Sequence, residues 1–441
     1  MDESRAERVL ESTLPSRVLL LGAGGFIGSA VLARFTTEGV KVRAVARRRE
    51  PSSLAGVEWR ALDLATLLNP KDWLPHLEGV DVVVNCAGVL QGAESRAVHV
   101  DSARALYVAC ERASVRRVVL VSAIGVDRGA VSEFSATKVA GEQALMATSL
   151  EWVVLRPSVV VGRAAYGGTA LLRGLAALPV TLEFPDTGPL QVVQLDDLVA
   201  TIVVLSRRGA PSRIALDVVG PERLPFSGVV ETFRQWLRLP PAPRWRVPRF
   251  LAALSYGLGD FARVLGWRSP AGSVARRELT RGAVGDPAAW QTIMGSEPTA
   301  LALALSREPA SVQERRFARL YFVKPAVFAV LALFWIGTGL ISFGPGWEPA
   351  LEYLRAGGAS EGLAQAAAMV GALADIVIGV GLAFRRTARH ALFGAIAVSV
   401  FYLISGTFVL PQSWLEPLGP MLKILPIVVL NVVALAIVED R

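Results

Sequence analysis

Three glycines stand at a fixed spacing between an apolar run and a segment of helical length near the start of the chain. Gly22, Gly25 and Gly28 form a G-x-x-G-x-x-G pattern that also contains Phe26 and Ile27. Glycine permits a tight turn and a close approach of the backbone to a pyrophosphate, and the N-terminus of the following helix offers free N–H groups to an anion. One glycine at such a turn would be weak evidence, but here the strand, the spacing and the helix agree. We therefore expect a nucleotide-binding turn.

The residues after the second apolar run indicate which nucleotide is bound. An NAD enzyme usually has an acidic residue at the end of this strand, where it binds the 2′-hydroxyl of the adenosine ribose. This chain has Arg47 and Arg48 there and no acid before Glu50. Arginine pairs with a 2′-phosphate, whereas a carboxylate would repel it. We expect NADP(H) to be favoured over NAD(H); the alternative is a solvated basic loop.

The glycine turn needs a strand before it and a helix after it, and the first half of the chain repeats that arrangement. Short runs rich in valine and leucine alternate with segments of helical length between Arg17 and about Leu239. Runs that are apolar on both faces are typical of buried parallel strands. The alternation predicts an α/β domain with a doubly wound parallel sheet, which we place at residues 16–239 after an N-terminal tail at 1–15.

The last third of the chain is apolar enough to cross a membrane. Residues 325–347 and 391–415 contain no charge, 362–384 contain only Asp375, and 420–438 contain only Lys423. About 20 apolar residues span the hydrocarbon core of a bilayer. We therefore expect an all-α transmembrane bundle of four spans at residues 319–441. A basic amphipathic connector at 240–318 joins it to the first domain.

The basic residues indicate an orientation in the membrane. They gather before the first span and between the second and third: Arg315, Arg316, Arg319, Lys324, Arg385, Arg386 and Arg389. The other two connections carry only Arg355 and Lys423. By the positive-inside rule, we expect a multi-pass protein of the cell (inner) membrane with both the N-terminal domain and the C-terminus in the cytoplasm. The arginine-rich connector either lies on an anionic membrane surface or packs on the first domain.

Composition excludes several classes of protein. With 52% hydrophobic and 19% charged residues, disorder cannot describe the whole chain. Two cysteines and three scattered histidines provide neither a disulfide framework nor a histidine-based metal site. We expect no metal ion and no nucleic-acid partner; the lipid bilayer is the expected partner.

Further short motifs follow the glycine turn. They are Asp63-Leu64, Asn85-Cys86-Ala87-Gly88, Val121-Ser122-Ala123, Arg156-Pro157-Ser158 and the stretch 191–198. Together they resemble the short-chain dehydrogenase/reductase superfamily, particularly its extended and atypical members, over roughly residues 16–235. The resemblance implies an NAD(P)-binding Rossmann-type domain. In it, Asp63 and Leu64 lie at the adenine, Ala87, Gly88 and Pro157 line the cofactor site, and Ser122 and Lys138 form the catalytic frame.

The chain departs from that superfamily at its proton donor. The superfamily uses a Y-x-x-x-K pair, in which the lysine holds the nicotinamide ribose and the tyrosine exchanges a proton with the substrate oxygen. Here Phe134 stands four residues before Lys138. Phenylalanine cannot exchange a proton, and general acid–base catalysis is typically worth about 10²–10⁴-fold. Ser135 and Thr137 are nearby hydroxyls that need an activating base.

The apolar spans resemble the DoxX-like membrane family, which is linked to quinone and thiol redox systems, over roughly Arg319 to Val438. A carboxylate at the centre of a span, such as Asp375, costs about 2.5–3.5 kcal/mol and often marks a functional site; the alternative is a protonated group that only packs. We expect a membrane-tethered NADP(H)-binding oxidoreductase-like protein acting on a quinone or another lipid-soluble redox substrate. The alternatives are a catalytically inactive accessory or assembly subunit of a membrane redox complex and a nucleoside-diphosphate-sugar epimerase-like enzyme.

Overall fold

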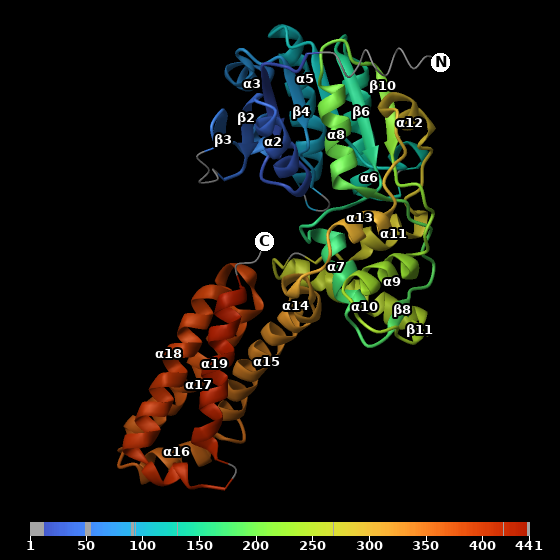
Figure 1. Ribbon diagram of the computed structural model, residues 1–441. Helices are drawn as coiled ribbons and strands as arrows, with labels where there is room; N and C mark the ends of the chain where they lie inside the picture. The colour runs from blue at the N-terminus through green and yellow to red at the C-terminus, as the bar shows by residue number, and fades with distance from the viewer. Residues whose placement is uncertain are drawn as a thin grey trace. The chain divides into compact units, whose positions relative to one another are not determined.

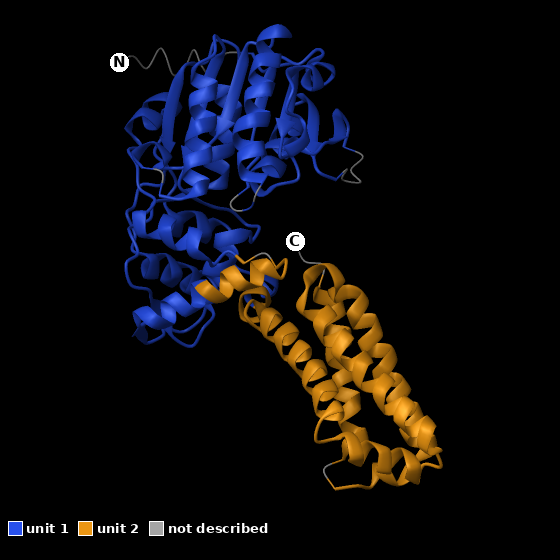
Figure 2. Cartoon of the chain, turned by 180° about the vertical axis from the view of Figure 1, so that it is seen from behind, with its two compact units in different colours: residues 1–256, 270–315 blue, residues 257–269, 316–441 orange. Residues whose placement is uncertain are grey.

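The computed structural model describes residues 13–48, 54–89, 92, 94–129, 131–267, 269–417 and 419–438. The chain forms two compact units, drawn in blue and orange in Figure 2. Unit 1 comprises Met1–Tyr256 and Pro270–Arg315, and unit 2 comprises Gly257–Ser269 and Arg316–Arg441. The segment 240–318, expected as a connector, is therefore divided between the two units.

Unit 1 is built on a seven-stranded sheet in which every neighbouring pair of strands is parallel, in the order β10-β6-β5-β4-β1-β2-β3 (Figure 1). The strands are β1 (Arg17–Leu21), β2 (Lys41–Ala46), β3 (Val57–Ala61), β4 (Val82–Asn85), β5 (Arg117–Val121), β6 (Glu151–Pro157) and β10 (Ile214–Val218). The chain runs outward from β1 in one direction and from β4 in the other. The doubly wound parallel sheet predicted from the sequence is thus confirmed.

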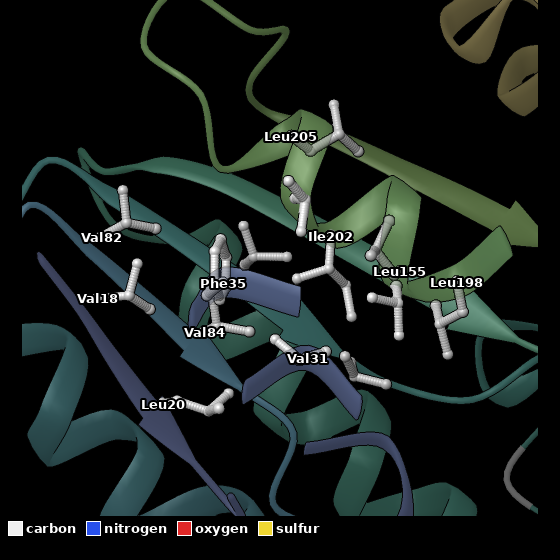
Figure 3. Packing of buried hydrophobic residues seen from close by; sticks show 14 of the residues in the cluster. Val18, Leu20, Val31, Phe35, Val82, Val84, Leu155, Leu198, Ile202 and Leu205 are labelled. Atoms are coloured by element: carbon white, nitrogen blue, oxygen red, sulfur yellow. The ribbon is translucent and has the colours of Figure 1, made fainter. Parts of the chain in front are cut away.

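Helices cover both faces of this sheet, which is why its strands are apolar on both sides. On one face, Val18 and Leu20 of β1 pack with α2 (Phe26–Thr37) and α8 (Leu195–Leu205), as Figure 3 shows. On the other, Leu19 and Leu21 pack with α3 (Pro70–Leu77) and α5 (Ser102–Arg112). Helix α6 (Glu133–Met146) contributes Leu145 to this second cluster.

The rest of unit 1 includes two small parallel pairs of strands, β7 with β9 and β8 with β11. These strands are β7 (Val159–Val161), β8 (Thr181–Glu183), β9 (Val192–Gln194) and β11 (Arg244–Arg246). The accompanying helices are α7 (Gly167–Ala176), α9 (Phe226–Trp236), α11 (Ser273–Arg281), α12 (Ala288–Met294) and α13 (Leu301–Arg307). Short helical segments complete it: η1 (Leu64–Thr66), α4 (Glu94–Arg96), the π-helical η2 (Ala97–Asp101) and η3 (Val126–Arg128).

Unit 2 is helical, and its helices are α15 (Val323–Phe343), α16 (Trp347–Ala356), α17 (Glu361–Ala383), α18 (Arg385–Val409) and α19 (Pro420–Ile437), with the short η4 (Pro411–Trp414). Two helices cross from one unit to the other, α10 (Arg249–Val264) and α14 (Val312–Leu320). Four helical stretches are long and apolar enough to cross a membrane. The first, Val312–Phe343, comprises α14 and α15, and the others are α17, α18 and α19. Each of the four expected spans overlaps one of these stretches. The third begins at Arg385, before the expected 391, because the helix continues through the arginines that follow Phe384.

Candidate functional site

The glycine turn joins β1 to α2 at the point where the strand order reverses. Gly22 has a φ of +74°, and a Cβ there would lie 3.0 Å from the backbone N of Ala87, at the end of β4. A Cβ on Gly28 would lie 2.1 Å from the carbonyl oxygen of Gly22, so only glycine lets α2 start this close to the turn. Gly25 donates its N–H to Gly22 at 2.9 Å and precedes the first helical residue, Phe26. Dinucleotides bind at such a reversal in open α/β sheets, outside the carboxyl ends of the strands.

Lys138 on α6 reaches the same edge of the sheet. Its Nζ donates to the carbonyl oxygens of Val121, at 3.1 Å, and Ala87, at 3.3 Å. The side chain is buried, and this burial lowers the pKa of Lys138 from 10.5 to about 8, while the neighbouring Cys86 and Glu142 act in the opposite direction. A Cβ on the exposed Gly88 would be 3.4 Å from Nζ, so Gly88 lies directly beside the ammonium group.

Ser122 is the residue after β5 and adjoins Val121, to which Lys138 donates. Its Oγ is buried and has no hydrogen-bond partner. A buried hydroxyl without a partner is costly, and it usually has a ligand or a water that completes it. The orphaned hydroxyl, the glycine turn and the buried ammonium therefore fit a bound nicotinamide nucleotide. The structure brings Ser122 and Lys138 together, as the motifs imply.

Phe134 is half-buried on α6 and has no proton to give. Its ring meets the ring of His99 edge-on, with 6.0 Å between the centroids. Nε2 of His99 accepts the N–H of Val89 at 2.9 Å, which leaves Nδ1 to carry the proton and donate to Oγ1 of Thr137, also at 2.9 Å. The hydroxyl of Thr137 in turn lies 3.0 Å from the carbonyl oxygen of Glu133. Both nitrogens of His99 and the hydroxyl of Thr137 are therefore already engaged in hydrogen bonds within the protein.

His99 stays neutral, because burial and then the charge of Lys138 lower the pKa of its imidazole to about 3. No motif in the sequence marks His99 as a residue of the site. It lies 38 residues from Thr137, and no spacing signals their contact.

Ser135, the other candidate hydroxyl, faces away from solvent. Its Oγ donates to Oε1 of Glu278 on α11 at 2.5 Å, as does that of Ser132. Arg281, also on α11, pairs with Glu278 and donates to the carbonyl oxygens of Ile124 and Gly125. Helix α11 thus closes over the start of α6, and Ser135 is fully buried. Nothing in the local sequence signals this contact, since α11 lies more than 130 residues later in the chain.

The expected adenosine-side residues occupy the neighbouring strand ends. Arg47 and Arg48 follow β2 and are both exposed, and Arg47 lies 3.7 Å from Glu94. Asp63 caps η1 by accepting the N–H of Ala65 at 3.1 Å, and Leu64 packs on the cluster below α3. An anion at the end of β2 would therefore meet the exposed Arg48, together with an Arg47 whose ion pair with Glu94 is exposed to solvent.

On the far side of the turn, Pro157 ends β6 and accepts the N–H of Ile124 at 3.0 Å. Phe26 stacks on Tyr166, which precedes α7, with 5.8 Å between centroids and 4° between planes. No motif indicates this pair, which attaches the start of α7 to the glycine turn.

Unit 2 places its one central carboxylate inside the bundle. Asp375 is buried, and the hydroxyl of Tyr402 on α18 lies 3.4 Å from its Oδ1. Two further polar atoms are buried without a partner, Nε1 of Trp335 and Oδ1 of Asn431. Among the described residues, no cluster of His, Cys, Asp and Glu could hold a metal ion.

Two family descriptions match the chain. Residues 22–174 match the NAD(P)H-binding family, and residues 332–432 match the DoxX-like family. The chain is 25% identical over 197 residues to the ceramide reductase of Caulobacter vibrioides, a match that covers 43% of this chain and 61% of that protein. It is 28% identical over 224 residues to an uncharacterised protein of Mycobacterium tuberculosis, covering 50% of this chain and 22% of the relative. The chain therefore spans less than two thirds of these relatives.

Solved structures share the fold of unit 1. The enzyme WbmG of Bordetella bronchiseptica, in complex with NAD, has a TM-score of 0.54 at 17% identity, covering 70% of this chain and 97% of that one. UDP-glucuronic acid 4-epimerase of Bacillus cereus, with UDP-glucuronic acid and NAD, has a TM-score of 0.50 at 17% identity, covering 70% and 99%. The chain thus has an NAD(P)-binding domain with a Rossmann fold at its N-terminus and a DoxX-like domain at its C-terminus, and four of its helices are long and apolar enough to cross a membrane.

Proposed function

We propose that this chain, an NAD(P)-binding Rossmann domain joined to a DoxX-like domain, is a membrane oxidoreductase that reduces a lipid-soluble substrate. One observation carries the proposal. The buried ammonium of Lys138 and the unpartnered hydroxyl of Ser122 are kept together beside the glycine turn, on a chain that also has four helices able to span a membrane.

The proposed roles follow the edge of the sheet. Gly22, Gly25 and Gly28 shape the turn that brings the pyrophosphate close to the backbone, and the N–H groups at the start of α2, at Phe26 and Ile27, bind it. Lys138 and Ser122 orient the nicotinamide ribose and ring, Ala87, Gly88 and Pro157 line that pocket, and Asp63 and Leu64 border the adenine. Arg47 and Arg48 pair with a 2′-phosphate, which makes NADP(H) the favoured nucleotide. A bound reduced nicotinamide nucleotide supplies a hydride.

The residues of this site narrow the substrate class. Phe134 gives no proton, Thr137 is held by His99, and Ser135 is buried under Glu278. A substrate that accepts a hydride and then takes its proton from water needs no protein hydroxyl. Quinones have this property, because one hydride and one proton from water give the hydroquinone.

A lipid with a carbonyl group is the second substrate class that is compatible with this site. Its reduction to an alcohol also requires one proton, and water is the source that this site leaves, because Phe134 carries none and Thr137 and Ser135 are already hydrogen-bonded. Similarity to the ceramide reductase of Caulobacter vibrioides supports this substrate class.

The second candidate is a nucleotide-binding accessory or assembly subunit of a membrane redox complex. Phe134 favours it, since the ring fills the position of a proton donor and packs on His99. An epimerase-like activity is the least supported alternative, because sugar epimerisation by the superfamily's mechanism uses the missing tyrosine.

We also propose the domain boundaries 1–15, 16–239, 240–318 and 319–441. We further propose that the chain lies in the cell (inner) membrane with its N-terminal domain and its C-terminus in the cytoplasm. The arginines between the second and third spans support this orientation. A reporter fused after Arg441 should report the cytoplasm, and one inserted near Gly357 should report the opposite side. Opposite locations for residues 1 and 441 would mean an odd number of spans.

Steady-state turnover tests the activity. The full chain, reconstituted in lipid vesicles, is given NADPH with either a short-chain quinone or a 3-keto sphingoid lipid, and nucleotide absorbance is followed. Oxidation that requires the acceptor, and that falls in Lys138→Met, supports the oxidoreductase. Tight nucleotide binding without turnover on either acceptor supports the accessory subunit instead.

A further inference from the structure

Helix α10 has an exposed face made entirely of apolar residues. Phe250, Leu254, Leu258, Phe261 and Val264 are between 56% and 79% exposed and recur every three or four residues along the helix. The other exposed positions between Phe250 and Val264 are an alanine and a glycine, so no charged side chain interrupts this face. We call these five large side chains the α10 stripe. Soluble proteins rarely leave such a continuous apolar surface in water, and its presence indicates a partner.

The C-terminal end of α10 is attached to one end of the helical bundle in unit 2. The indole N–H of Trp267 donates to the carbonyl oxygen of Ala383, the last residue of α17, at 2.8 Å. The N–H of Arg385, the first residue of α18, donates to the carbonyl oxygen of Leu265 at 3.0 Å. The ring of Trp267 also packs on Phe328, early in α15, with 4.7 Å between centroids. These contacts hold the end of α10 at the level where three membrane-spanning helices end.

This end of the bundle is basic. Lys324 is the second residue of α15. Arg385, Arg386 and Arg389 lie in the first turns of α18. Beside the stripe, Arg263 pairs with Asp260 at 2.6 Å on the flank of α10. Tryptophan and basic residues concentrate at membrane–water interfaces, and basic clusters there attract anionic lipid headgroups.

We propose that α10 is an in-plane membrane helix. The α10 stripe enters the boundary between headgroups and acyl chains, and the basic cluster of Lys324, Arg385, Arg386 and Arg389 binds anionic headgroups at the same level. Helices of this kind bury one apolar face in the interface and keep charged residues at its edge. The attachment of Trp267 to the ends of the spans argues for lipid, because it fixes the helix at the depth where lipid headgroups lie.

Single-cysteine labelling of the full chain in vesicles tests the proposal. Leu258→Cys and Phe261→Cys carry an NBD fluorophore, and Ala289→Cys on α12, an exposed helical position in unit 1, is the matched control. The chain's own thiols at Cys86 and Cys110 are covered by a labelling blank of the unsubstituted protein. Vesicles contain phosphatidylcholine alone or mixed with phosphatidylglycerol, with or without a lipid that carries a doxyl quencher near its headgroup.

Emission at 258 and 261 should shift to the blue, and doxyl lipid should quench it several-fold more than emission at 289. Phosphatidylglycerol should strengthen this quenching. Emission like that of residue 289, quenched by aqueous iodide, would overturn the proposal. Shielding from both iodide and doxyl lipid would also overturn it, since a protein partner or a second copy would then cover the stripe. Equal quenching in both kinds of vesicle would overturn the role of anionic headgroups. The two labelling sites are independent, so misfolding of one variant leaves the other as a test.

Discussion

Replacing Lys138 by methionine tests the nucleotide site at its buried charge. The ammonium donates to the carbonyl oxygens of Val121 and Ala87 and has further donor capacity beside Gly88. Hydrogen bonds from a charged group are worth about 1.5–3 kcal/mol, and about 1.4 kcal/mol is a factor of ten in affinity. Lys138→Met should therefore weaken NADPH binding about 10- to 100-fold at pH 7. The control is Lys71→Met, which removes an exposed lysine on α3 and should change nothing.

The pH dependence of binding follows from the same residue. In the free protein, burial lowers the pKa of Lys138 to about 8, whereas hydrogen bonds from the ammonium to the ribose of a bound nucleotide favour the charged form and raise that pKa. Below pH 8 the lysine is charged in both states and affinity is constant. Above pH 8 the free protein has lost the proton that binding requires, so affinity should fall by up to about tenfold per pH unit. Lys138→Met should remove this slope.

The melting temperature of Lys138→Met distinguishes a loss of NADPH affinity from misfolding of the variant. Lowering a lysine pKa from 10.5 to about 8 means that charging Lys138 costs the folded state about 3 kcal/mol at neutral pH, a cost that disappears as pH rises above 10.5. Methionine removes that cost but leaves the carbonyl oxygens of Val121 and Ala87 without their donor, at about 1–3 kcal/mol each. The melting temperature of the nucleotide-free protein should therefore change little. The assay is NADPH fluorescence titration from pH 6 to 10 alongside thermal melting. Unchanged affinity in Lys138→Met, with its slope retained, would refute the role of Lys138.

Three further substitutions test other parts of the site. Phe134→Tyr should leave NADPH affinity unchanged and give at most a trace of new carbonyl reduction, measured by product formation; a large loss of affinity would contradict the position assigned to this ring. Arg47→Glu combined with Arg48→Ala should weaken NADPH binding much more than NADH binding, and equal losses in fluorescence titrations would remove these arginines from the 2′-phosphate. Gly28→Ala should abolish binding of both nucleotides and lower the melting temperature, because its Cβ would lie 2.1 Å from the carbonyl oxygen of Gly22, whereas Gly168→Ala, in open space on α7, should do neither.

The fold could be predicted from the sequence because its signals are local. Each strand of the sheet is a short run of valine and leucine, and the alternation of faces, with Leu20 on one side and Leu21 on the other, follows from the pleat. The glycine turn was equally clear, since the requirement for glycine at Gly28 is set by backbone atoms six residues away. The four apolar spans follow from length and charge alone.

The contacts that define the site's chemistry could not be predicted, because they join residues far apart in the chain. Glu278 reaches Ser135 from α11, and His99 reaches Thr137 from η2, with no pattern that links them. Both contacts matter, since they occupy the two hydroxyls that could have replaced the missing tyrosine. Arg47 and Arg48 are both exposed, and the sequence does not determine the conformation of an exposed arginine side chain. For this reason the sequence does not show which of the two binds a phosphate.

The most direct test of the proposed oxidoreductase activity follows the hydride of NADPH into the lipid product. The full chain in lipid vesicles is mixed with a stoichiometric amount of NADPH deuterated at carbon 4 of the nicotinamide and with the quinone or keto lipid, and the lipid products are analysed by mass spectrometry. We expect one equivalent of NADP⁺ for each reduced acceptor. Deuterium should be retained on carbon in an alcohol product and exchanged with water in a hydroquinone, and the yield should be lost in Lys138→Met. Nucleotide that binds stoichiometrically and remains reduced with both acceptors would contradict the account and leave a nucleotide-binding accessory subunit.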